Sequence, residues 1–384
     1  MALKVAGRAA IAPFIVMEVM RAAAEREAAG GEVLHLEVGQ PGTSAPSAVL
    51  AAAHRALDKD VIGYTLALGI DPLREAIARH YRATYGVDVP ARRVVVTTGS
   101  SGGFLLSFVA AFDVGDRVAI AEPGYPCYRN ILATLGLVPV GLPVDGSTNF
   151  QPTAAMIEAL DPPVAGLIVA SPSNPTGTML DRAALAALIA ACRARGIRLI
   201  SDEIYHGITH GTAATTAAAL DADAVVVNSF SKYFSMTGWR LGWLVVPDDL
   251  LKPIERLAQN LFISPPTLSQ RAALAAFDCR AELDANVARY RVNRDRLLAA
   301  LPDAGFTGLS RAEGAFYVYA DVSRLTNDSE ELCRTLLAET GVAITPGIDF
   351  DPARGHRWVR FSFAGTTATV DEAARRLVAW HRKR

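Results

Sequence analysis

Gly166-Leu167-Ile168-Val169-Ala170, an unbroken apolar run, precedes an Ala/Leu-rich segment at residues 181–195 and a second apolar run at residues 198–201. The middle segment repeats apolar side chains at helical spacing: Leu185, Leu188, Ile189 and Cys192. Strand, helix and strand in this order form the crossover unit of a parallel sheet. Strands that are apolar throughout are typical of a sheet covered on both faces. The stretch therefore predicts an α/β fold.

The same alternation continues on both sides of this stretch and changes towards the C-terminus. Three further apolar runs lie at residues 93–98, 117–121 and 224–228. After Pro265-Pro266 a helical pattern covers residues 268–301, and the rest mixes strand and helix patterns: residues 315–319, 329–340, 358–363 and 370–382. We expect a large domain at residues 46–284, with a mainly parallel sheet flanked by helices. A smaller α+β domain would combine residues 1–45, an N-terminal arm and helix, with residues 285–384.

Composition places the chain among well-packed globular proteins. The 384 residues are 51% hydrophobic, with 38 basic against 39 acidic side chains. A chain so close to neutral has no general attraction for nucleic acid or for a membrane surface. The four cysteines lie far apart, which fits a reducing cytoplasm better than a disulfide framework. His206 and His210 stand four residues apart, but glycines interrupt the stretch, and we expect no metal site.

Polar residues follow the ends of the predicted strands. In a parallel sheet these ends lie along one edge, where α/β proteins bind ligands. The first strand runs into Thr98-Gly99-Ser100-Ser101-Gly102-Gly103, which opens a helix. Such a segment forms an anion site, or else only a helix cap with a tight turn. It has neither a GxGxxG nor a GxxxxGK[ST] pattern, which argues against nicotinamide cofactors and nucleoside triphosphates.

Three later strand ends carry one notable side chain each. Tyr125 follows the second strand and forms either a packed aromatic or one wall of a site for a flat ligand. Asn174 follows the third, where it bonds a ligand or only closes a turn. Asp202 ends the fourth. An unpaired carboxylate at the tip of a buried strand is expensive, which implies a cationic partner.

The last strand end completes the description of a ligand. Lys232 comes just after it, with Ser229 before and Arg240 eight residues later. The serines and Arg240 suit a phosphate, whereas Asp202 suits a protonated ring nitrogen. Tyr205 suits a ring hydroxyl, and Lys232 suits an aldehyde. Pyridoxal 5′-phosphate (PLP) carries all of these groups.

Nearly the whole chain, from Gly39-Gln40-Pro41-Gly42 to Val359-Arg360-Phe361-Ser362, resembles the class I/II aminotransferases, the fold type I PLP enzymes related to aspartate aminotransferase. The motifs occur in the family's order and spacing: Ser171-Pro172-Ser173-Asn174-Pro175-Thr176-Gly177, Asp202-Glu203-Ile204-Tyr205, Ser229-Phe230-Ser231-Lys232 and Gly238-Trp239-Arg240-Leu241-Gly242. Any one of them could arise by chance, whereas their coincidence is specific. The resemblance implies transfer of an amino group from an L-amino acid to a 2-oxo acid such as 2-oxoglutarate.

The resemblance also implies a role for each residue of the site. Lys232 would form the Schiff base with PLP and then move the substrate's proton, and Asp202 would keep the pyridinium nitrogen protonated. Tyr205, the third catalytic residue, would bond the ring oxygen together with Asn174, while Tyr125 would stack on the ring. The phosphate would be held by a larger set: Gly99, Ser100, Ser101, Ser229, Arg240 and, from the neighbouring subunit, Tyr64.

On the substrate side, the resemblance implies that Arg360 grips the α-carboxylate as a two-pronged fork. Asn174 and the backbone of Gly39 would assist. The role of Tyr64 implies a homodimer with shared active sites.

Two segments depart from the family's pattern near the expected substrate entrance. Pro346-Gly347-Ile348-Asp349-Phe350 runs into Asp351 where the family often has a Phe-Gly pair, and Ala12-Pro13-Phe14-Ile15 replaces a small polar residue. The expected lining is apolar or aromatic: Phe14, Ile15, Leu68 and Tyr125. Because a carboxylate side chain would be poorly solvated there, the sequence favours neutral, apolar or aromatic amino donors.

Two other functions share part of this pattern. A PLP-dependent lyase or synthase of the same fold would need Lys232, Asp202 and Arg360 as well, so that the motifs alone do not separate it from a transaminase. A PLP-sensing transcriptional regulator would carry an additional basic DNA-binding domain, whereas this chain starts almost directly with the enzyme's arm. We expect a cytoplasmic aminotransferase.

Overall fold

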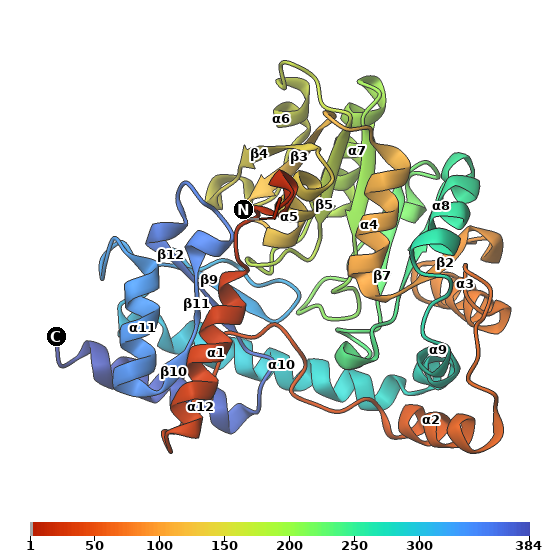
Figure 1. Cartoon of the computed structure of the whole chain (residues 1–384). Coiled ribbons are helices and arrows are strands. Elements are labelled where there is room, and N and C mark those ends of the chain that lie inside the picture. The colour runs from red at the N-terminus through yellow and green to blue at the C-terminus, as the bar shows by residue number, and fades with distance from the viewer. Residues whose placement is uncertain (1–2) are drawn as a thin grey trace.

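The structure is a computed structural model that describes residues 3–384 (Figure 1). Its main feature is a seven-stranded sheet in the order β2-β8-β7-β6-β5-β3-β4. The strands are β2 (Val94–Thr97), β3 (Arg117–Glu122), β4 (Val138–Pro143), β5 (Gly166–Ala170), β6 (Arg198–Asp202), β7 (Val225–Ser229) and β8 (Gly242–Val245). Only β8 runs antiparallel to its neighbours among these strands, so the mainly parallel sheet is confirmed.

Helices cover both faces of this sheet, which explains why its strands are apolar throughout. On one face, residues such as Val227 and Leu244 pack against three helices: α4 (Gly99–Ala111), α5 (Pro126–Thr134) and α8 (Asp248–Leu261). On the other face, residues such as Val226 and Trp243 pack against the remaining helices of this part: α2 (Ser47–Lys59), α3 (Asp71–Tyr85), α6 (Ala154–Glu158), α7 (Arg182–Ala194) and α9 (Thr267–Ala273).

The strand register brings the polar residues of the sequence motifs to one edge. Ala170 pairs with Asp202, and Asp202 pairs with Val227. Ser229 and Thr97 both pair with Gly242, which joins the end of β7 to the end of β2. The expected meeting of these strand ends is therefore present.

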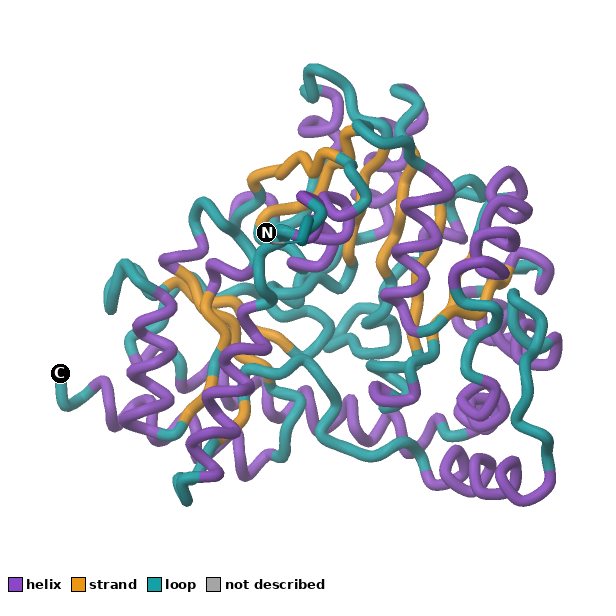
Figure 2. The backbone as a smooth tube through the Cα atoms, viewed as in Figure 1, coloured by secondary structure: helices purple, strands orange, loops and turns teal. Residues whose placement is uncertain are grey.

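A second, smaller unit lies beside the first and joins both ends of the chain (Figures 1 and 2). Its antiparallel sheet has the order β11 (Thr345–Pro346), β12 (Trp358–Ser362) and β9 (Tyr317–Asp321). A separate pair joins β1 (Leu34–His35) to β10 (Val342–Ala343), which places the N-terminal segment against the C-terminal third, as expected. The helices are α1 (Ile15–Ala28), α10 (Arg280–Ala300), α11 (Ser329–Thr340) and α12 (Thr367–His381).

The helical region expected at residues 268–301 is confirmed, and it consists of more than one element. A short 3₁₀ segment, Leu274–Asp278, separates α9 from α10. The expected boundary at residue 284 falls inside α10, and both domain boundaries remain predictions. None of the helices within residues 3–384 combines the length and the apolar character that crossing a bilayer requires.

Candidate functional site

Lys232 lies in the turn after β7 and reaches the N-terminal segment. Its Nζ donates a hydrogen bond to the carbonyl of Gly39 at 2.6 Å and lies 5.8 Å from the centre of the Tyr205 ring. Burial, followed by the guanidinium groups of Arg360 and Arg240, lowers the pKa of Lys232 to about 8. A substantial fraction of this amine is therefore neutral near physiological pH, as a nucleophile requires.

Asp202 ends β6 and is 2% exposed. Its Oδ1 accepts the backbone N–H of Ile204 at 3.1 Å, and its Oδ2 accepts the hydroxyl of Tyr128. Burial raises the pKa of Asp202 to about 6. Because both oxygens bond neutral donors, the negative charge of this buried carboxylate remains available for a cationic ligand.

Tyr128 was missed in the sequence. It lies in the first turn of α5, three residues after Tyr125, and their rings meet edge to face with centres 5.3 Å apart. The spacing of three residues on a helix that begins at Pro126 would have placed both rings on one side. Tyr125 also contacts Phe14 edge to face at 6.0 Å.

The hydroxyl of Tyr205 lies 2.8 Å from that of Tyr317, the first residue of β9. Tyr317 was also missed, since it lies inside a buried strand of the smaller unit. A Cβ on Gly39 would lie only 2.0 Å from the Tyr317 hydroxyl oxygen. Glycine at this position therefore allows the backbone to approach both Tyr317 and Lys232.

Arg360 lies in the middle of β12, buried between two aromatic rings. Its guanidinium carbon is 4.5 Å from the ring centre of Tyr317 and 4.8 Å from that of Phe350. Nη1 donates to Oδ1 of Asn174 at 3.0 Å, and Nη2 donates to the carbonyl of Glu37 and to Oγ1 of Thr345. Nε is buried and has no hydrogen-bond partner among residues 3–384. A buried cation whose bonds go only to neutral acceptors fits a carboxylate ligand.

The segment around Gly99 is shaped as an anion cradle. Gly99 begins α4 with a φ of +67°, and a Cβ there would lie 2.6 Å from Nη2 of Arg240. Ser100 and Ser101 complete the first turn of α4, whose backbone N–H groups have no partner within the helix. The hydroxyl of Ser229 accepts the N–H of Ser231 at 3.0 Å, so it shapes the loop from within.

Tyr64 is not brought to the other residues within this chain. Its ring is 82% exposed, in a segment that also exposes Val61 and Leu66. Gln270, which is fully buried, holds this segment: Nε2 donates to Oγ1 of Thr65 at 3.0 Å, and Oε1 accepts the N–H of Ile70 at 2.8 Å.

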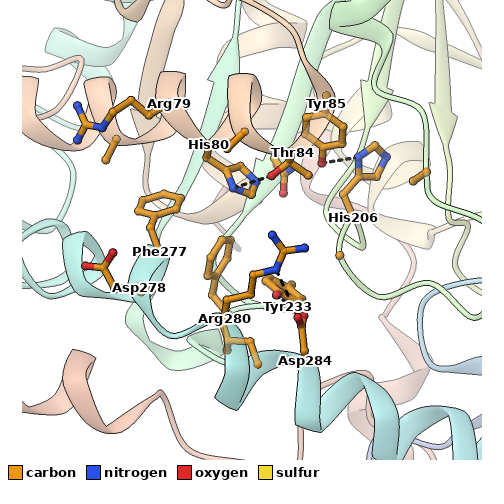
Figure 3. Close-up of a pocket in the computed structure, with 18 of the residues that line it drawn as sticks. Arg79, His80, Thr84, Tyr85, His206, Tyr233, Phe277, Asp278, Arg280 and Asp284 are labelled. Atoms are coloured by element: carbon orange, nitrogen blue, oxygen red, sulfur yellow. Dashed lines mark hydrogen bonds and ion pairs between the residues drawn. The ribbon is translucent and has the colours of Figure 1, made fainter.

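A cavity of about 510 Å³ lies beside α3, from which His80 and Tyr85 contribute to its wall (Figure 3). Its lining includes residues of α3, the turn after Lys232 and the start of α10, and none of the candidate site residues. Tyr233 donates to Oδ1 of Asp284 at 2.6 Å. His206 accepts the Tyr85 hydroxyl at 2.9 Å and donates to the carbonyl of Ser171 at 3.0 Å, so this cavity wall supports the turn that carries Asn174.

The sequence profile described as aminotransferase class I and II matches residues 31–377. The chain belongs to this family. It is 53% identical over 381 residues to a valine–pyruvate aminotransferase of Mycobacterium tuberculosis, with 98% of each chain covered. It is 33% identical to a (5-formylfuran-3-yl)methyl phosphate transaminase of Methanocaldococcus jannaschii, with 95% of each covered.

Solved structures of the family show the same architecture. The crystal structure of an aminotransferase from Mycobacterium tuberculosis matches all of both chains with a TM-score of 0.98 and 52% identity. Aspartate aminotransferase of Thermus thermophilus with maleate matches with a TM-score of 0.92 and 31% identity, covering 98% of this chain and 100% of that one.

Aminotransferases of this family depend on PLP, and the site of this aminotransferase fits that cofactor. The uncompensated carboxylate of Asp202 matches a protonated ring nitrogen, and the lowered pKa of Lys232 matches a group that reacts with an aldehyde. The close approach of Arg240 to the backbone of Gly99, where a Cβ would lie 2.6 Å from Nη2, places a guanidinium beside the first turn of α4 and fits a phosphate bound there.

Proposed function

We propose that this aminotransferase takes the amino group from a neutral, apolar or aromatic L-amino acid and passes it to a 2-oxo acid. The proposal is carried by Arg360, a buried guanidinium that has no carboxylate partner, and no partner for Nε, in the described part of the chain. It would bind the α-carboxylate common to all amino acids. The contact of Phe14 with Tyr125 would then form an apolar wall beside the substrate's side chain.

When bound, PLP supplies the electron sink that weakens the bonds at the substrate's Cα. The chain's own residues bind and position the reactants. Asp202 would face the ring nitrogen, while Tyr205 and Asn174 would bond the ring oxygen. Nζ of Lys232 would hold the cofactor's aldehyde carbon and would accept the proton released at the substrate's Cα.

Arg129, a cation on α5 four residues after Tyr125, is already engaged, which supports a neutral donor. Nη1 of Arg129 lies 3.3 Å from Oε1 of Glu122, and its Nη2 donates to the carbonyl of Asp349. A second substrate carboxylate, as in aspartate or 2-oxoglutarate, would have to compete with Glu122 for this cation. We keep 2-oxoglutarate as an acceptor and add pyruvate, because a relative with 53% identity is named for valine and pyruvate.

We also propose a homodimer in the cytoplasm. The homodimer is supported by the exposed Tyr64 ring, which would reach the partner's phosphate site.

A donor and acceptor panel tests the substrate proposal. Valine, leucine, phenylalanine, alanine and aspartate are each assayed with pyruvate and with 2-oxoglutarate, and both products are quantified. We expect the apolar donors to lead and the two products to form in equal amounts. Aspartate far ahead of the apolar donors would refute the neutral pocket, and oxo acid or ammonia formed without a new amino acid would indicate a lyase.

Arg360→Lys tests the carboxylate site. Lysine keeps the charge but loses the two-pronged geometry, so we expect KM to rise at least about tenfold for every donor, whatever its side chain. Arg375→Lys, an exposed arginine paired with Glu372 on α12, is the matched control and should leave KM unchanged. A KM that changes for one donor only would contradict this role of Arg360.

A further inference from the structure

The N-terminus of α1 is held by a carboxylate from the far end of the chain. The backbone N–H of Ile15 donates to Oδ1 of Asp349, and that of Val16 donates to Oδ2, both at 3.3 Å. Phe14, the residue in the cap position, supplies no side-chain acceptor. Asp349 thus does for α1 what a local serine or aspartate does at most helix starts. It also joins the two segments in which the sequence departs from its family.

This bond fixes the place of one aromatic ring. Residues 3–13 are all exposed, and within them the turn Gly7–Ala9 lies against α5, the helix that follows Tyr125. Phe14 directly precedes the two bonded amides, and its ring meets Tyr125 edge to face at 6.0 Å. Because both N–H groups bond a single carboxylate, the peptide that carries Phe14 has little freedom to turn away.

Asp349 itself is held on a rigid support. It is 3% exposed and ends the short 3₁₀ turn Gly347–Asp349. A Cβ on Gly347 would lie 2.5 Å from the carbonyl oxygen of Trp358, so this turn packs directly on β12. The next residue, Phe350, lies under the guanidinium of Arg360. One short segment therefore contacts both the carboxylate-binding arginine and the proposed side-chain wall.

We propose that Asp349 is a specificity-determining positioning residue, which holds the start of α1 so that Phe14 closes the apolar side-chain pocket against Tyr125. The proposal rests on the proposed function, because it assigns a pocket for neutral side chains. Asp349 acts through Phe14. It selects among donors by side chain and leaves the groups that bind PLP and the α-carboxylate in place.

The first experiment compares donors in the holoenzyme. For Asp349→Ala we expect the ratio of kcat/KM for valine to kcat/KM for alanine to fall by about tenfold. An apolar pocket distinguishes substrates that differ by one methylene group by at least about this factor, and the variant would lose that contact. Asp349→Asn keeps one acceptor oxygen and should give a smaller fall. Phe14→Ala should lower this donor ratio as much as Asp349→Ala does. The donor ratio of the double variant should lie within about twofold of the ratio of either single variant, because both changes act on the same contact.

Asp328→Ala is the matched control, because Asp328 caps α11 through the N–H of Glu331 at 3.0 Å. It should leave the donor ratio unchanged. If Asp349→Ala lowers kcat/KM for all donors by one common factor, or if its effect adds fully to that of Phe14→Ala, then Asp349 has only a structural role and the proposal is wrong.

The second experiment needs no substrate. Hydrogen exchange of the amides of Ile15 and Val16 should be at least about tenfold faster in Asp349→Ala and in Asp349→Asn than in the parent holoenzyme. Unchanged exchange would overturn the proposal even if apolar donors are good substrates. Conversely, the amides of Ile15 and Val16 could exchange faster in the Asp349 variants while the parent enzyme rejects every apolar donor. That result would overturn the proposed function, but it would still show that Asp349 fixes the start of α1.

Discussion

At the residue scale, Lys232 and Asp202 show how burial sets the charge of two groups before any ligand binds. Burial, followed by the nearby Arg360 and Arg240, lowers the pKa of Lys232. Burial raises the pKa of Asp202, although Tyr128, the N–H of Ile204 and the charge of Lys232 partly oppose that shift. Both shifts move the pKa towards neutrality, so that the amine is more often neutral and nucleophilic, while the carboxylate needs a cationic partner to hold its charge firmly.

The pKa of Lys232 predicts how the PLP-free protein captures its cofactor. Since burial lowers that pKa to about 8, the neutral fraction grows about tenfold per pH unit below pH 8 and levels off above it. The rate of cofactor capture, measured by visible absorbance after mixing with PLP, should follow this curve. Lys232→Ala should give no such phase. A midpoint at or above pH 10, typical of an exposed lysine, would contradict the prediction.

Asp202→Asn should slow the chemical step much more than it weakens substrate binding. Loss of the charge opposite the ring nitrogen removes a stabilising interaction of the kind that costs about 10²–10³-fold in kcat. Tyr128→Phe is the control, because it removes only a neutral donor to Oδ2 and should cost less than about tenfold. Single-turnover spectra separate binding from chemistry. A kcat that survives nearly unchanged would show that Asp202 has another role.

The residues that sequence reasoning found mostly share one property. Most of them follow a predicted strand, so that the rule for ligand sites in parallel sheets places them, whereas Gly39, Tyr64 and Arg360 came only from the family resemblance. Tyr128 and Tyr317 escaped because they reach the site from a helix and from a strand of the other sheet. Their place depends on packing between distant segments, which no local pattern records.

At the element scale, the start of α4 is the feature with the tightest geometric requirement. Gly99 combines a positive φ with the close approach of Arg240. Other elements were harder to foresee. β4 contains Pro139, Gly141 and Pro143, a pattern that predicts a loop. The structure places β4 at the edge of the sheet, where prolines are tolerated. β8 has four residues, too few for a periodic pattern, and its antiparallel direction follows from tertiary pairing.

Gly99→Ala should weaken PLP binding by at least about tenfold, because the added methyl group would lie 2.6 Å from the guanidinium of Arg240 and displace it. Gly86→Ala is a close control. It ends α3 with a φ of +69°, nearly that of Gly99, and has no atom within 4 Å of the added methyl group. Both variants should lose about 1 kcal/mol of stability from backbone strain, but only Gly99→Ala should raise the dissociation constant measured by PLP titration.

At the scale of the whole molecule, the exposed Tyr64 segment predicts that two chains build each site. Inactive Lys232→Ala chains mixed with impaired Tyr64→Ala chains should regain activity, because a hybrid dimer contains one site with both residues intact. Tyr233→Phe is the control, because Tyr233 lies next to Lys232 in the same chain. A mixture of Tyr233→Phe chains with Lys232→Ala chains should show no more activity than the Tyr233→Phe chains show alone. Hybrids that form, as shown by native mass spectrometry, but remain inactive would indicate self-contained subunits.

The helix α10 also gives the molecule a mechanical lever. Its 21 residues form a rod about 30 Å long. At one end Asp284 grips Tyr233, the neighbour of Lys232, and further along Asn293 bonds the carbonyls of Phe363 and Gly365, just beyond β12. A tilt of about 4° would displace one end by about 2 Å relative to the other. We therefore expect that a rotation of the smaller sheet, which carries Arg360, would pull on the turn that holds Lys232.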